Sequence, residues 1–190
     1  IGSTVTAHGA EAPDGYGLMG GAGIGGGLGT ASYAGSTISI DDSVVEAFGG
    51  GQAAGIGGGA HRTPISSDYS SVESVVITGS RVTAHGGRYA AGIGGGEEQN
   101  GAAVTIGAGS AVTSIGGYGD NWGSSGAGIG SGRSGESIVP SPGSIQLGGK
   151  LAAGASTGGG NGFRSGPEHM ERGGRAATIE PRTEGGTGSF

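Results

Sequence analysis

Paired carboxylates are the residues of this sequence that come closest to hydrolytic chemistry. Acidic side chains stand next to each other at Asp41 with Asp42 and at Glu97 with Glu98. Single acids occur at Asp14, Asp68, Glu73 and Asp120. Hydrolysis of a polysaccharide needs two carboxyl groups about 5–10 Å apart, and loops on a rigid scaffold could supply them. We favour the alternative, in which these carboxylates solvate loops and fill turn positions, and the catalytic residues are unknown.

The sequence has few groups of side chains that could coordinate a metal ion. Calcium takes roughly six to eight oxygen ligands, and the sequence contains neither a D-x-[DN]-x-[DN]-G loop nor a G-G-x-G-x-D repeat. Side-chain oxygens gather at Glu97, Glu98 and Asn100, which makes this loop the one candidate for calcium. No other cofactor is expected.

Two histidines occupy equivalent places in two copies of VTAHG. His8 and His85 are separated by Phe48 in the intervening copy and followed by Ile115 in the next one. If the copies stack as neighbouring strands, the two imidazoles lie about 9.6 Å apart. This spacing favours a ladder of stacked side chains over a set of metal ligands.

One loop combines aromatic and hydrogen-bonding side chains. The stretch GGYGDNWGSSG contains Tyr118, Asp120, Asn121 and the single tryptophan, Trp122. A flat ring can pack against the apolar face of a sugar, so these four residues are the predicted ligand-binding residues. The alternative is that the rings pack beneath their own loop as a small satellite core.

A glycine-rich motif recurs four times. It reads GAGIGGG at 21–27, AAGIGGG at 53–59 and 90–96, and GAGIGSG at 126–132. Gly21, Gly23 and Gly26 match G-x-G-x-x-G, the phosphate-binding pattern of nucleotide folds. None of the copies leads into an amphipathic helix, which that function requires, so the repetition indicates a structural role.

Composition narrows the possible partners. Glycine makes up 52 of 190 residues, without the strict three-residue period of collagen. Nine basic residues stand against fifteen acidic ones with no basic cluster, which argues against nucleic acid. The chain has no cysteine, so it forms no disulfide, and no apolar run is long enough to span a membrane.

The repeat extends well beyond the glycine motif. Its central isoleucines, Ile24, Ile56, Ile93 and Ile129, are 32, 37 and 36 residues apart, a period typical of solenoids. Each period contains two further segments rich in Val, Ile and Thr. They read VTAHG (5–9), VEAFGG (45–50), VTAHGG (82–87) and VTSIGG (112–117), preceded by TISI (37–40), VVI (75–77), VTI (104–106) and SIQL (144–147).

Alternation within these segments predicts strands with one face in a core. The expected inward columns are Ile38, Val75, Val104, Ile145; Ile40, Ile77, Ile106, Leu147; Val5, Val45, Val82, Val112; and Ala7, Ala47, Ala84, Ser114. Ala54, Ala91 and Ala127 are expected to point inward with the central isoleucines of the third strand. Stacked repeats then form a parallel β-helix of about four to five coils, each with three short strands and long loops.

The repeat predicts a domain at 1–160, followed by an atypical C-terminal cap or tail at 161–190. Ile1 stands four positions before Val5, whereas Ile40 and Ile77 stand five before the equivalent valines. We therefore expect the chain to start in the middle of a coil as part of a longer or processed polypeptide. An upstream segment or a partner chain is then expected to cover the N-terminal coil.

The tandem units resemble those of large secreted or wall-attached bacterial surface proteins. The pattern V-T-A-x-G-G, A-G-I-G-G-G, V-T-I-x-G over roughly residues 1–160 carries this resemblance. The architecture also resembles the right-handed β-helical carbohydrate-binding proteins and polysaccharide-active enzymes. The resemblance implies a right-handed solenoid, and export, adhesion or polysaccharide contact. We predict a non-catalytic module that binds a glycan or a protein partner. The alternative is a polysaccharide-active glycosidase or lyase, or one chain of a split β-helix enzyme.

Overall fold

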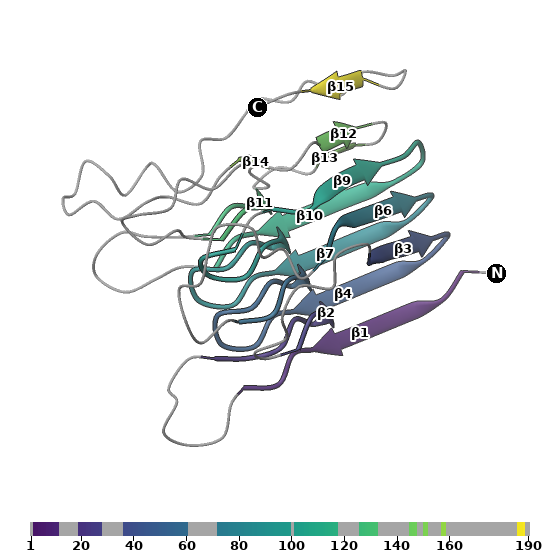
Figure 1. Cartoon of the computed structure of the whole chain (residues 1–190). Helices are drawn as coiled ribbons and strands as arrows, with labels where there is room; N and C mark the ends of the chain where they lie inside the picture. The colour runs from purple at the N-terminus through teal and green to yellow at the C-terminus, as the bar shows by residue number, and fades with distance from the viewer. Residues whose placement is uncertain are drawn as a thin grey trace.

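The structure, a computed structural model, describes residues 2–11, 19–27, 36–60, 72–99, 101–117 and 126–132, and the backbone of short strands at 145–147, 150–151, 157–158 and 186–188. Within these ranges the regular elements are all β-strands, and they form three five-stranded sheets. Successive strands along the chain belong to different sheets, so each sheet collects every third strand up to β14 (Figure 1). This is the arrangement that the repeats predict.

The first sheet contains the VTAHG-type segments in the order β1-β4-β7-β10-β13. Its strands are β1 (Thr4–His8), β4 (Val44–Phe48), β7 (Arg81–His85), β10 (Ala111–Ile115) and β13 (Lys150–Leu151). All pairs are parallel. The pairs from β1 to β10 have the register predicted from the repeat, with Val5 opposite Val45, Val45 opposite Val82 and Val82 opposite Val112.

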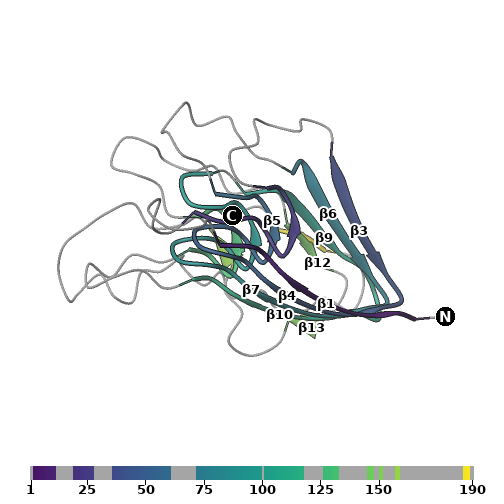
Figure 2. The same cartoon turned by 90° about the horizontal axis from the view of Figure 1, so that it is seen from below.

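The second sheet has the order β15-β12-β9-β6-β3. Its strands are β3 (Thr37–Asp41), β6 (Ser74–Thr78), β9 (Ala103–Ile106), β12 (Ile145–Leu147) and β15 (Gly186–Gly188). The pairs from β3 to β12 are parallel, and β15 is antiparallel to β12. Viewed from below, this sheet and the first one meet at a corner like the two sides of a wedge (Figure 2).

The third sheet is built from the glycine motif. Its strands are β2 (Ile24–Gly25), β5 (Ile56–Gly57), β8 (Ile93–Gly94), β11 (Ile129–Gly130) and β14 (Thr157–Gly158). Each strand is only two residues long, because the chain bends tightly around the Ile-Gly pair. In the second coil, the Ala54 N–H donates to the Gly58 carbonyl oxygen at 2.8 Å and closes this bend.

Stacked columns of β-branched side chains form the core between the sheets. Val75, Val82 and Ile93 are almost fully buried, as are their neighbours in the next coil, whereas Ile38, the neighbour of Val75 in the preceding coil, is partly buried. Alternation along each strand places these residues inward, so the core follows from the period-two pattern of the sequence. Ala54, Ala91 and Ala127 are also fully buried.

Glycine is required at the second residue of each short strand. Four equivalent glycines, Gly25, Gly57, Gly94 and Gly130, have φ angles of 133°, 131°, 133° and 142°. Residues other than glycine rarely adopt this backbone conformation. A Cβ atom on Gly57 would also meet the carbonyl oxygen of Gly94 in the next coil. The repeated glycine therefore permits both the bend and the close approach of successive backbones.

A residue with a positive φ angle followed by a serine recurs at the corner between the second and first sheets. Asp42, Gly79 and Gly109 have positive φ angles there, and each is followed by a serine. The Ser80 hydroxyl donates to the Thr78 carbonyl oxygen at 2.7 Å and accepts from the Ser43 N–H at 3.0 Å. The serine thus fixes its own corner and links it to the corner of the preceding coil.

The ends of the predicted domain are described less completely. Val5 lies in a predicted inward column, yet it is 41% exposed, because β1 is the end strand of its sheet. Ile1 lies outside the described residues. Of the predicted cap at 161–190, only the backbone of Gly186–Gly188 is described, so the boundary at residue 160 stays a prediction.

Candidate functional site

The outward side of the first sheet is a regular surface formed by four strands of five residues each. We call the outward residues of β1, β4, β7 and β10 the outer face. They are Thr4, Thr6, His8, Val44, Glu46, Phe48, Arg81, Thr83, His85, Ala111, Thr113 and Ile115. Strict register aligns them in three columns that run across the four strands.

The third column of the outer face is a ladder of rings. His8 stacks on Phe48 with ring centroids 4.7 Å apart and ring planes at 5°, and Phe48 stacks on His85 at 4.9 Å and 8°. Ile115 is the next residue in register. The predicted stacked ladder is therefore confirmed, and the phenyl ring of Phe48 lies between the two imidazoles.

This stacking decides which part of each ring a ligand can reach. The faces of Phe48 are covered by the two histidines, so the ring edges point to solvent. A ligand over the outer face would meet imidazole nitrogens and ring C–H groups, with threonine hydroxyls in the next column. These groups suit a partner that has both hydroxyl and apolar surface.

Exposed apolar side chains lie on the same face as the ladder. Val44 is 48% exposed and Ile115 is 43% exposed, and Phe48 is half-buried. Arg81 is next to Val44 in register, and Glu46 lies between Val44 and Phe48 along β4; both charged side chains are exposed. The outer face therefore combines apolar, hydroxyl and charged groups on a sheet.

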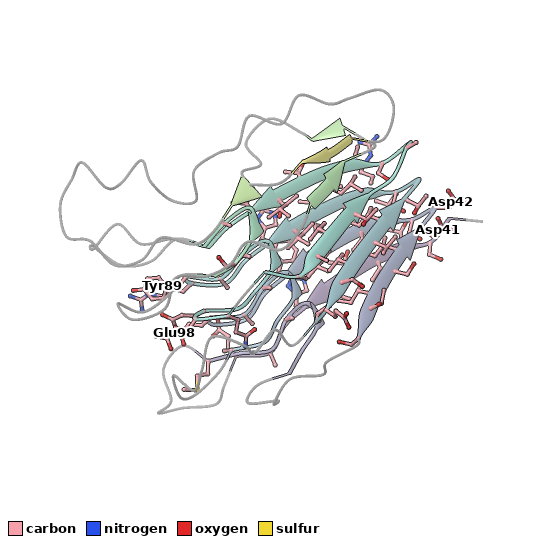
Figure 3. The ribbon with its side chains drawn as sticks, turned by 45° about the horizontal axis from the view of Figure 1, so that its top comes forward. Asp41, Asp42, Tyr89 and Glu98 are labelled. Carbon is pink, nitrogen blue, oxygen red and sulfur yellow. The ribbon has the colours of Figure 1, made fainter. Side chains whose placement is uncertain are left out.

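The two acidic pairs do not come together. Asp41 and Asp42 lie at the exposed corner between β3 and β4, whereas Glu97 and Glu98 follow β8. Figure 3 shows Asp41 and Asp42 on one side of the sheets and Glu98 on the other. Glu73 is exposed just before β6. The predicted acids Asp14, Asp68 and Asp120 lie outside the described residues.

The predicted calcium loop is held by hydrogen bonds of its backbone and of one buried amide. The Glu97 N–H donates to the Gln52 carbonyl oxygen at 2.9 Å. The Gln99 amide donates to the Gly59 carbonyl oxygen at 2.8 Å and accepts from the Gly96 N–H at 3.3 Å. Among the described residues, no group of three His, Asp or Glu side chains is placed to hold a metal ion. Asn100 lies outside these residues, so the calcium site stays a prediction.

The aromatic loop proposed as a ligand site cannot be placed in the fold. Tyr118, Asp120, Asn121 and Trp122 all lie outside the described residues. One other tyrosine, Tyr89, is described and is only 4% exposed, with the Arg88 guanidinium carbon 4.9 Å from its ring centre. Tyr89 is therefore buried and does not offer its ring to a ligand.

The sequence predicted the ladder, with Ile115 in its column, but exposed Val44 on the same face was missed. Val44 precedes Val45 directly, and only one of two adjacent residues in a strand can face the core. The repeat aligns Val45 and Ala47 with the inward valine and alanine columns, so Val44 could have been recognised as an outward residue.

Comparisons with protein-family models, with curated proteins and with solved structures find no match to this chain. Within the described part of the chain, no helix has the length and apolar character needed to cross a membrane.

Proposed function

We propose that this chain is a non-catalytic module of a secreted or cell-surface bacterial protein that binds a glycan or a protein partner. The observation that carries the proposal is the outer face, where a ladder of rings ends at exposed Ile115 next to the hydroxyls of Thr83 and Thr113. An aromatic and apolar column beside hydroxyl groups on a regular surface suits an interaction site.

The scaffold we propose for this surface is a right-handed parallel β-helix of about four to five coils. The parallel register of three stacked sheets supports a solenoid. Parallel strands in one sheet are almost always connected with a right-handed crossover, which supports the handedness. A solenoid of this kind presents equivalent side chains at regular intervals, and this suits a partner that is itself repetitive or flat.

The proposed ligand chemistry follows from the groups that point to solvent. Imidazole nitrogens and the hydroxyls of Thr83 and Thr113 can bond to the hydroxyls of a sugar, while Ile115 and the edge of Phe48 contact its C–H surface. A protein partner would use the same apolar residues, with Glu46 and Arg81 available for ion pairs. The resemblance to secreted bacterial surface repeats supports an extracellular location.

Two further sequence predictions, an aromatic loop and a calcium site, remain part of this proposal. The loop with Tyr118, Asp120, Asn121 and Trp122 is proposed as a second contact for glycan. Calcium at Glu97, Glu98 and Asn100 is proposed as an optional structural ion. Neither requires the outer face, so both can be tested separately from it.

The test is a glycan array and a polysaccharide pull-down with matched surface variants. We expect Ile115→Lys to weaken binding and Val76→Lys to leave it unchanged, because Val76 is a half-buried residue on a strand of the second sheet. Trp122→Ala reports on the loop, and a chelator reports on calcium. Binding that is lost only with Trp122→Ala would move the site away from the outer face. Sugar released into the supernatant would contradict a non-catalytic module and favour a polysaccharide-active enzyme.

A further inference from the structure

The free edge of β1 is a second surface, which adjoins the outer face at His8. β1, β2 and β3 are the end strands of their three sheets, and no strand in the described ranges pairs with their free edges. Val5 is 41% exposed, whereas Val45 and Val82 in the same column are 4% and 1% exposed. The first layer therefore leaves in solvent a side chain whose equivalents in later layers are buried.

Main-chain groups along this edge are positioned to pair with another strand. The Val44 N–H donates to the Ser3 carbonyl oxygen and the Gly9 N–H donates to the Phe48 carbonyl oxygen, both at 2.8 Å. Because successive residues of a parallel strand direct their N–H and C=O groups to opposite sides, Thr4, Thr6 and His8 direct theirs away from β4. Such a row is a template for strand addition.

The ring ladder indicates which side chains an added strand would carry. One face of the His8 ring is covered by Phe48 at 4.7 Å, and no ring among the described residues stacks on its other face. From β1 to β10, each strand places a valine next to the valine of its neighbour, and β4, β7 and β10 place a ring or an isoleucine in the column of His8. A strand with the pattern apolar, polar, small, ring would continue both columns.

Acidic side chains near β1 favour a partner segment with positive charge. The first 61 residues contain five acidic residues and neither lysine nor arginine. Four of these acids, Glu11, Asp41, Asp42 and Glu46, are described and exposed. A field of one sign raises the local concentration of the opposite charge, so an added strand with basic ends fits this edge best.

We propose that the free edge of β1 binds an extended basic segment of a partner protein, which adds to the first sheet as a parallel strand. Its apolar residue covers Val5, its small residue covers Ala7 and its ring stacks on His8. This binding uses the main-chain edge of β1 and shares the His8 ring with the outer face, but it does not depend on the glycan-binding proposal.

The chain itself supplies a suitable probe for this edge. Residues 80–88, SRVTAHGGR, have the required pattern and an arginine near each end. The experiment titrates this peptide, labelled, into the full chain and follows amide hydrogen exchange by NMR. We expect exchange at Thr4, Thr6 and His8 to slow at least about tenfold, while Val5 and Ala7 change little because their amides already face β4. Affinity should fall as salt rises, and a scrambled peptide should not bind.

Variants then identify the contacts. Val5→Lys should weaken peptide binding about tenfold or more, and His8→Ala by about threefold to tenfold, as expected for one ring contact. Val44→Lys is the matched control, since it adds the same charge at a similarly exposed valine on the neighbouring strand, and it should retain most of the affinity. Ile115→Lys should also retain it, which separates this edge from the outer face.

Three results would overturn the proposal. The first is no binding of the peptide by the wild-type chain. The second is equal loss of affinity in Val5→Lys and Val44→Lys, which would reflect charge alone. The third is slow exchange at Thr4, Thr6 and His8 in the peptide-free chain that is lost on dilution, because this would assign the edge to a second copy of the chain. The exchange measurement on the wild-type chain needs no variant, so the test stands even if one variant does not fold.

Discussion

At the scale of single residues, polar side chains at the corners act as specific hydrogen-bond partners. Ser80 is almost fully buried, and its hydroxyl both donates and accepts. Ser110 is its equivalent in the next coil, but its hydroxyl makes one longer bond, to the Ile77 carbonyl oxygen at 3.3 Å. That oxygen also accepts the Gly107 N–H at 2.7 Å, so it keeps a partner without the serine.

Replacing Ser80 should therefore cost more stability than replacing Ser110. Ser80→Ala leaves the Ser43 N–H without its acceptor, and we expect the free energy of unfolding to fall by about 1–3 kcal/mol. Ser110→Ala should cost less than about 1 kcal/mol, since the carbonyl oxygen keeps its backbone partner. Urea denaturation of the two variants measures the difference, and equal losses would show that the second hydrogen bond of Ser80 contributes nothing.

Phe48 provides a second prediction at this scale. Its ring lies between His8 and His85, and each stacked pair is worth roughly 0.5–1.5 kcal/mol beyond the buried area. Phe48→Ala should therefore lower the free energy of unfolding by about 1–3 kcal/mol. In NMR spectra, the ring protons of both histidines should move together as the ring current is lost. Phe48→Leu keeps the apolar contact but not the ring, so it should restore stability in part and leave both resonances shifted.

At the scale of elements, the glycine motif forms a strand because it combines a bend with close backbone stacking. Gly57 meets both requirements: its φ angle is 131°, and the carbonyl oxygen of Gly94 occupies the space of a Cβ. Gly109 meets only the first. Its φ angle is 77°, and a Cβ there would lie 3.6 Å from the nearest atom, the Gly79 Cα.

This contrast separates the cost of conformation from the cost of a clash. Gly109→Ala should destabilise the fold by about 1 kcal/mol, the usual penalty for a left-handed residue with a side chain. Gly57→Ala should cost more than about 3 kcal/mol, because backbone strain and displacement of the next coil add together. Thermal and chemical unfolding of both variants provide the measurement. A similar loss at the two positions would contradict a stacking role for the glycine column.

The strands and their register could be predicted from the sequence, because alternation in a stacked repeat leaves only one register that buries every apolar column. The length of the third strand could not, since Ala54 and Ile56 alternate as a longer strand would, while the bend depends on φ angles. Asp42 adopts a corner conformation that glycine adopts in the next coils, and no repeat pattern reveals this. The Trp122 loop lacks any repeating partner, so neither its position nor its contacts follow from the period.

At the scale of the whole molecule, stability is distributed along a stack in which each coil contacts only its neighbours. In such an array, a substitution costs in proportion to how completely the neighbouring layers bury it. The valine column of the first sheet makes this visible, because chemically identical side chains differ only in their layer. Val5 is substantially exposed at the free edge, whereas Val82 lies between two layers and is 1% exposed.

Replacement of valine by alanine should therefore lower the free energy of unfolding by different amounts at Val82 and at Val5. Val82→Ala removes two methyl groups from a packed interior and should lower the free energy of unfolding by about 2–3 kcal/mol. Val5→Ala removes them from a site already open to water and should cost less than about 1 kcal/mol.

The comparison also tests the free edge, because the cost of Val5→Ala should rise once the peptide of residues 80–88 is bound and Val5 is covered. A cost for Val5→Ala as large as that for Val82→Ala in the peptide-free chain would mean that another layer already covers β1 in solution. A small and constant cost, with and without peptide, would mean that the added strand does not bury Val5.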